Sequence, residues 1–137
     1  MITLPDHTLK GVMRAALGSF GSMTTKGVNT RSVTPGITAS TTHSIAGGTP
    51  LTSEFNYIGT CANVGDAVTL PAMNPGQSVE VWNAGANAAA VYPAASGVTI
   101  DGGSAGAAVT LSATKRAKFL CVAAGVIVSA QLGVASA

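Results

Sequence analysis

Residues 79–122 read VEVWNAGANAAAVYPAASGVTIDGGSAGAAVTLSATKRAKFLCV. This stretch holds four short runs with β-strand character: Val79–Asn83, Ala89–Tyr92, Val109–Leu111 and Lys118–Val122. Glycines and other small residues separate the runs. Within Val79–Asn83, apolar and polar side chains alternate with the two-residue period of a half-buried strand. The stretch therefore predicts short strands joined by tight turns.

The segments on either side continue this pattern. Strand candidates precede the stretch at Phe55–Cys61 and Ala67–Leu70, and another follows at Val126–Ala130. Asn74-Pro75-Gly76 is a strong turn signal, because proline presets one central φ and glycine accepts a positive one. We expect Ala89–Tyr92 to pair with Val79–Asn83. Residues 41–137 are thus predicted to form an all-β domain, a small β-sandwich or jelly roll.

The first 40 residues have a different character and are expected to form an arm. Residues 5–17, PDHTLKGVMRAAL, contain a short helix candidate at about 6–17, with Asp6 as N-cap and Gly18 after its end. The helix either packs on its own domain or docks on another protein. The Gly-, Ser- and Thr-rich residues 18–42 are expected to be extended. The expected contacts of the arm with a partner are Leu9, Val12, Met13, Leu17 and Phe20, with Lys10 and Arg14 beside them.

Charged residues make up only 9% of the chain, against about 25% in ordinary soluble domains. A Thr- and Ser-rich free surface is one explanation. We favour the other, a surface largely covered by further subunits, because solubility depends on surface charge. Lys118–Val122 supports this, since its last four residues are apolar on both faces of the strand. The predicted oligomer interface consists of Phe119, Leu120 and Val122, and a trimer is preferred to a dimer.

Several classes of function find no support in the sequence. The net charge of +2 is too small to indicate nucleic-acid binding, even though the positive charge is concentrated in the arm. Cys61 and Cys121 lie outside any CxxC motif, so no metal or cofactor is expected. Buried free thiols are the favoured state for both, with a disulfide left open. No P-loop, nucleophile elbow or calcium loop is present, and no enzyme is predicted.

A membrane span is not expected either. Residues 119–137 carry no charge and follow three basic residues, as a span does. However, Ala123-Ala124-Gly125 interrupts the run, and several polar residues follow it. A span needs about 20 predominantly apolar residues. Two short strands explain this segment better.

The spacing within the opening stretch resembles a β-module of tailed-phage virion proteins. The resemblance begins with Val81-Trp82-Asn83-Ala84-Gly85-Ala86-Asn87 and Val91-Tyr92-Pro93, and continues with Ile100-Asp101-Gly102 and the segment from Leu111 to Phe119. It covers roughly residues 40–130. The end departs from the pattern, because Val126-Ile127-Val128 stands where these modules carry an aromatic residue.

The resemblance implies a capsid decoration (cement) or head-fibre protein. Such a protein lies on the capsid surface of the virion, binds the major capsid protein and assembles with copies of itself. The alternative is a head-fibre or tail-fibre component that recognises a host glycan, with Trp82, Tyr92 and Tyr57 as stacking residues. A lone Trp more often packs in a core or an interface.

Overall fold

The computed structural model describes residues 24–25 and 28–132, and the chain divides into two units, Met1–Arg31 and Ser32–Ala137. In the first unit, β1 (Thr24–Thr25) and β2 (Val28–Asn29) form an antiparallel pair. The predicted helix at about 6–17 lies outside the described residues, as do the arm contacts Leu9, Lys10, Val12, Met13, Arg14, Leu17 and Phe20. The division falls between Arg31 and Ser32, earlier than the expected boundary near residue 40.

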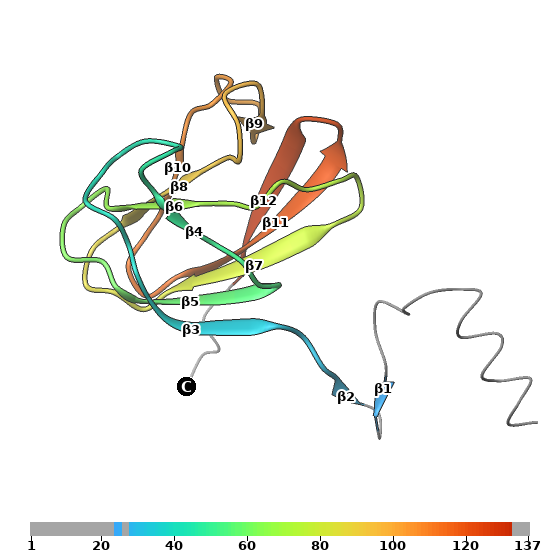
Figure 1. The fold of residues 1–137 in the computed structure, drawn as a ribbon, viewed down its shortest axis with the longest axis horizontal. Coiled ribbons are helices and arrows are strands. Elements are labelled where there is room, and N and C mark those ends of the chain that lie inside the picture. The colour runs from blue at the N-terminus through green and yellow to red at the C-terminus, as the bar shows by residue number, and fades with distance from the viewer. Residues whose placement is uncertain (1–23, 26–27, 133–137) are drawn as a thin grey trace, which may run out of the picture. The chain divides into compact units, whose positions relative to one another are not determined.

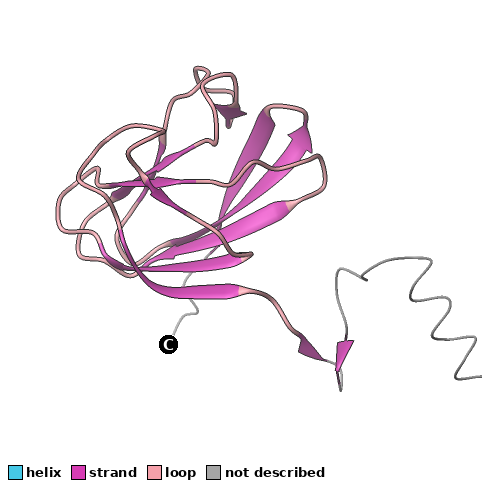
Figure 2. Cartoon of the chain, in the orientation of Figure 1, coloured by secondary structure: helices cyan, strands magenta, loops and turns pink. Residues whose placement is uncertain are grey.

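The second unit is all-β, as predicted, and no helix forms among the described residues (Figure 2). The described residues therefore contain no helix that could cross a membrane. Its strands are β3 (Val33–Thr38), β4 (Thr49–Pro50), β5 (Phe55–Thr60), β6 (Ala67–Thr69), β7 (Ser78–Asn83), β8 (Ala89–Tyr92), β9 (Thr99–Ile100), β10 (Val109–Leu111), β11 (Arg116–Ala123) and β12 (Val126–Leu132). They build a six-stranded sheet in the order β3-β5-β7-β11-β12-β9 and a four-stranded sheet in the order β10-β8-β6-β4 (Figure 1).

The chain winds between the two sheets as in a short solenoid. It alternates from one sheet to the other between β3 and β8, and equivalent strands of successive turns pair in parallel. Both sheets are mixed, whereas a jelly roll is built from antiparallel strands. The expected pairing of β7 with β8 is wrong, because these strands lie in different sheets. The connection between them crosses from one sheet to the other, so both strands direct side chains into the shared core.

The final strands close the solenoid with antiparallel pairing. β11 pairs with β7 on one side and with β12 on the other, and β10 pairs with β8. The β11–β12 hairpin turns at Ala124-Gly125, where Gly125 has a φ of 72°. A register shift between Cys121 and Ala123 bends β11 beside this turn.

The corner between β7 and β8 explains the Asn-x-Gly-x-Asn spacing in structural terms. Asn83 is fully buried, and its Oδ1 accepts the N–H of Gly85 at 3.0 Å. Its Nδ2 donates to the carbonyls of Asn87 (2.9 Å) and Leu111 (3.0 Å). Asn87 in turn donates to the carbonyls of Cys61 (3.0 Å) and Ala62 (2.8 Å) in the preceding turn of the solenoid. The motif therefore joins successive corners, because the buried Asn83 amide and the partly buried Asn87 amide satisfy backbone groups of neighbouring segments.

Candidate functional site: an open sheet face

The edges of both sheets are poorly suited to adding a strand from another protein. β3 and β4 are edge strands, and each contains a proline, Pro35 and Pro50. Proline provides no N–H for a new ladder, and natural edges are often protected in this way. The opposite edge strands, β9 and β10, have only two and three residues. Recognition by this domain is therefore expected to use a sheet face.

The outer face of the four-stranded sheet is partly covered by its own chain. The hydroxyl of Thr69 donates to the carbonyl of Ile45 at 2.8 Å. A Cβ at Gly48 would lie 2.5 Å from Thr69 Oγ1, so residues 45–48 lie against β6. None of the exposed large apolar side chains of the described residues lies on this sheet.

The outer face of the six-stranded sheet, which we call the open face because it carries exposed side chains, has an apolar half. Along β11 and β12, buried residues alternate with outward-facing Leu120, Val122, Val126 and Val128, which we call the apolar half. Val122 is 49% exposed and Val128 39%, and Leu120 pairs with Val128 across the hairpin. A contiguous group of exposed apolar side chains is a candidate interaction surface.

The other half of this face carries aromatic and basic side chains. Register places Trp82 of β7 beside Tyr57 of β5 and, on its other side, beside Arg116 of β11. The Tyr57 and Trp82 ring centroids are 5.0 Å apart with a 59° tilt. We call Tyr57, Trp82 and Arg116 the aromatic–basic row. Glu80 and Lys118 form the next cross-strand pair, between this row and the apolar half.

The structure separates the residues that were expected to act together. Phe119 is 1% exposed and belongs to the core of its own domain, so its assignment to an oligomer interface is wrong. Leu120 and Val122 do lie on the outer face. In the glycan hypothesis, Tyr57 and Trp82 are neighbours, but Tyr92 lies on β8 in the other sheet.

Three residues of this face were not predicted as site residues. Val126 and Val128 were expected to lie in a strand that departs from the phage pattern, and Arg116 was assigned no role. The alternation along Val126–Leu132 would have placed both valines on one face. Arg116 carries no comparable signal, because its place beside Trp82 depends on the pairing of β11 with β7.

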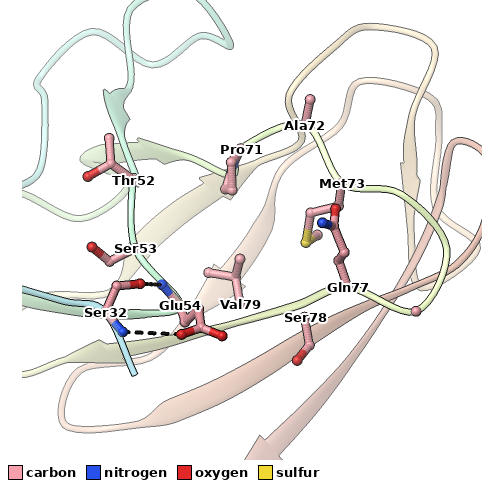
Figure 3. Close-up of a pocket in the computed structure, with 11 residues that line it drawn as sticks. Ser32, Thr52, Ser53, Glu54, Pro71, Ala72, Met73, Gln77, Ser78 and Val79 are labelled. Carbon is pink, nitrogen blue, oxygen red and sulfur yellow. Dashed lines mark hydrogen bonds between the residues drawn. The ribbon is translucent and has the colours of Figure 1, made fainter. Parts of the chain in front are cut away.

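A shallow groove of about 400 Å³ lies elsewhere in the domain (Figure 3). It runs between the Thr52–Glu54 and Pro71–Gln77 segments, with Val79 among its lining residues. Ser32 and Glu54 are joined by two hydrogen bonds, from Ser32 N–H to Glu54 Oε2 (3.1 Å) and from Glu54 N–H to Ser32 Oγ (2.9 Å) (Figure 3). Among the described residues of the lining, Glu54 is the one carboxylate, and no histidine, cysteine or lysine accompanies it. The groove therefore lacks the paired carboxylates of a glycosidase and a base for its serines.

The titratable groups of the interior serve the fold. Cys61 and Cys121 are both free and buried, as favoured from the sequence. Burial raises the pKa of the Cys61 thiol, and the nearby Asp66 carboxylate raises it further. A protonated thiol is a poor nucleophile and a poor metal ligand. The described residues contain no group of three or more side chains suited to holding a metal.

Asp66 is a fully buried carboxylate at the turn before β6. Its Oδ2 accepts the backbone N–H of Asn63 at 2.9 Å, and Oδ1 lies 3.4 Å from Asn63 Nδ2 and 3.6 Å from His43 Nε2. Hydrogen bonding to the Asn63 backbone lowers the pKa of Asp66 below its usual 3.8, against the opposing effect of burial. The folded state therefore favours the ionised form of this group.

Because of Asp66, we expect the free energy of unfolding to decrease at low pH, and we call this decrease the acid limb. Because the pKa is lower in the folded state, the stabilisation is fully present above pH 3.8 and is lost as the pH falls through the folded value. We expect Asp66→Asn to be less stable at neutral pH and to lose less stability on acidification. Urea unfolding between about pH 6 and pH 2 measures both effects.

A control separates the two partners of Asp66. His43→Ala keeps both Asn63 contacts, so it should retain most of the acid limb. Parallel stability curves for the native protein and Asp66→Asn would show that another group controls the acid limb.

Comparison with protein-family models, curated proteins and solved structures finds no match for this chain.

Proposed function

We propose that this protein is a structural component of a tailed-phage virion, a capsid decoration protein that binds and stabilises the major capsid protein lattice. The observation that carries the proposal is the apolar half of the open sheet face, in a domain whose sheet edges are protected. The scarcity of charge and the phage-type spacing in residues 81–119 support it. The domain is small and has two layers of sheet, a size and shape suited to a thin layer on a capsid surface.

In this proposal, buried apolar area provides most of the binding energy. Burial contributes about 25 cal/mol per Å² of apolar surface. Leu120 and Val122, with Val126 and Val128 beside them, form the contact between copies, with a trimer preferred to a dimer. The arm, here taken as residues 1–31 because β3 belongs to the sheet, reaches over the major capsid protein. The protein acts by binding at the capsid surface, without catalysis or a cofactor.

We expect Val122→Asp to weaken self-association and binding to undecorated capsids by at least about tenfold, because a carboxylate must be desolvated in the contact. Thr110→Asp is a matched control, since it places the same charge on an exposed position of β10 in the other sheet. Sedimentation with capsids and analytical ultracentrifugation measure the two effects. Undiminished binding by Val122→Asp would contradict the role of this face.

The same assay examines the arm. A chain that begins at Ser32 keeps β3 intact, since β3 starts at Val33. We expect this truncated protein to keep its self-association and to lose most of its capsid binding. If it binds capsids as well as the full chain, the arm has no part in docking.

A second function is favoured by the Tyr57–Trp82 pair. Trp82 is 40% exposed, although a lone tryptophan is usually buried. The ring of Tyr57 contacts it on one side. Exposed aromatic rings in this arrangement stack on sugar rings. A head-fibre or tail-fibre component that recognises a host glycan is therefore the alternative proposal. Copy number per virion separates them, because decoration proteins are numerous and fibre proteins are few.

A further inference from the structure

Trp82 lies against Tyr57 on the open face. It alternates with buried Val81 and Asn83 along β7, so its side chain points outward. Tyr57 lies beside it, and a Cβ at Gly59 would be 3.5 Å from Tyr57 Cε1, so the tyrosine ring lies next to the glycine. The strands β5, β7 and β11 lie side by side beneath the row (Figure 1). An aromatic surface that is ordered before binding loses little entropy when it binds a ligand.

The charge next to this aromatic surface is positive. Arg116 is exposed, and it is the direct cross-strand neighbour of Trp82 on the side opposite Tyr57. Among the described residues, neither Arg116 nor Lys118 forms an ion pair. Side chains opposite each other on antiparallel strands have Cβ atoms about 5 Å apart. A ligand ring on the Trp82 indole is therefore within reach of the Arg116 guanidinium.

We propose that the aromatic–basic row binds an acidic glycan, one that contains hexuronic acid residues. The apolar face of one sugar ring stacks on Trp82, Tyr57 supports the indole, and Arg116 donates two hydrogen bonds to the sugar carboxylate. Arginine suits this role because its planar fork matches the two carboxylate oxygens. The inference rests on the second proposed function, glycan recognition, and adds the chemical class of the glycan.

Charge density argues against a polyphosphate ligand for the same row. Single-stranded nucleic acid also stacks on aromatic rings, but such sites combine stacking with a basic groove that follows the backbone. Here the face offers Arg116 and Lys118, with Glu80 opposite Lys118. One guanidinium beside one indole matches one carboxylate beside one pyranose ring.

The chain contains a single tryptophan, so its fluorescence reports directly on Trp82. The test titrates the full-length protein with three probes at low salt: a tetramer of galacturonic acid, neutral maltotetraose and a thymidine decamer. We expect the galacturonate tetramer alone to change the Trp82 emission in a saturable way. Added salt should weaken its binding, because one charge pair contributes to it.

Variants of the row identify the contacts. Arg116→Gln should bind the galacturonate tetramer about tenfold more weakly at low salt, and the difference should shrink at high salt. Lys118→Gln removes an equal charge one register pair away and should have a smaller effect. Trp82→Ala, followed by calorimetry, should also bind at least about tenfold more weakly. Val128→Thr, on the apolar half of the same face, is the control and should bind normally.

Each other outcome overturns the inference in its own way. Equal binding of both sugars would keep glycan recognition and refute the preference for an acidic glycan. Tighter binding of the thymidine decamer would assign the row to nucleic acid. If no sugar changes the emission or the calorimetric signal, both the inference and the second proposed function fail.

Discussion

Gly85→Ala is expected to destabilise the domain by about 3 kcal/mol, because the corner between β7 and β8 has no room for a methyl group. A Cβ at this position would lie 2.6 Å from the backbone nitrogen of Cys61 and 2.7 Å from its Cβ. Those atoms belong to the preceding turn of the solenoid and cannot rotate away. Moving them would also disturb the Asn87 hydrogen bonds to Cys61 and Ala62. Urea denaturation of the variant and the native protein measures the difference.

Gly97→Ala is the matched control for this prediction. A Cβ at Gly97 meets no atom within 4 Å, and its φ is outside the positive range. The same substitution should there be neutral or slightly stabilising, because alanine restricts the unfolded chain. Equal stability of the Gly85 and Gly97 variants would mean that the corner can widen freely.

Phe119→Ala is expected to cost about 3–5 kcal/mol of the free energy of unfolding, the usual loss for a buried phenylalanine. Phe119 is the largest of the fully buried side chains among the described residues, and it lies on the inner face of the central strand β11. Its removal leaves a cavity between the two sheets that rigid neighbouring strands cannot fill. Thermal and urea unfolding of purified protein measure the loss.

Val122→Thr, three residues further along the same strand, tests the opposite face. Val122 is half-exposed, so the change should alter the free energy of unfolding by no more than about 0.5 kcal/mol. If Phe119→Ala left stability unchanged but abolished self-association, Phe119 would belong to an interface after all. The pair therefore separates folding from assembly on one strand.

The strands themselves were predictable because their signals are local. The runs expected at Val79–Asn83, Ala89–Tyr92 and Val109–Leu111 correspond to β7, β8 and β10 within one residue. Alternation and turn residues act over a few positions, and the pleat imposes its period of two whatever the strand pairs with. The Asn74-Pro75-Gly76 turn also forms, with Gly76 at a φ of 92°.

The partners of these strands were not predictable in the same way. β7 and β8 are joined by only five residues, yet they lie in different sheets. Asn83 and Asn87 attach their corner to Leu111 at the end of β10 and to Cys61. Those contacts join residues 26 and 28 positions apart. No local pattern specifies contacts at such distances, and a short connection alone favours the simpler hairpin.

The candidate site shows the same division. Trp82 and Tyr57 stand out in a chain with few aromatics, so the sequence identified them as candidate stacking residues. It also grouped Tyr92 with them, although β8 belongs to the other sheet, and it did not include Arg116. Grouping these residues correctly requires the strand order.

By itself, the sequence determined that this protein is all-β, where most of its strands and turns lie, and that its cysteines are favoured as free buried thiols. Only the tertiary structure decided that the sheets are wound as a solenoid, that Phe119 belongs to the core, and that one sheet face remains open. The reason is physical. Alternation specifies two faces for every strand, but which face is covered depends on packing between segments far apart in the chain.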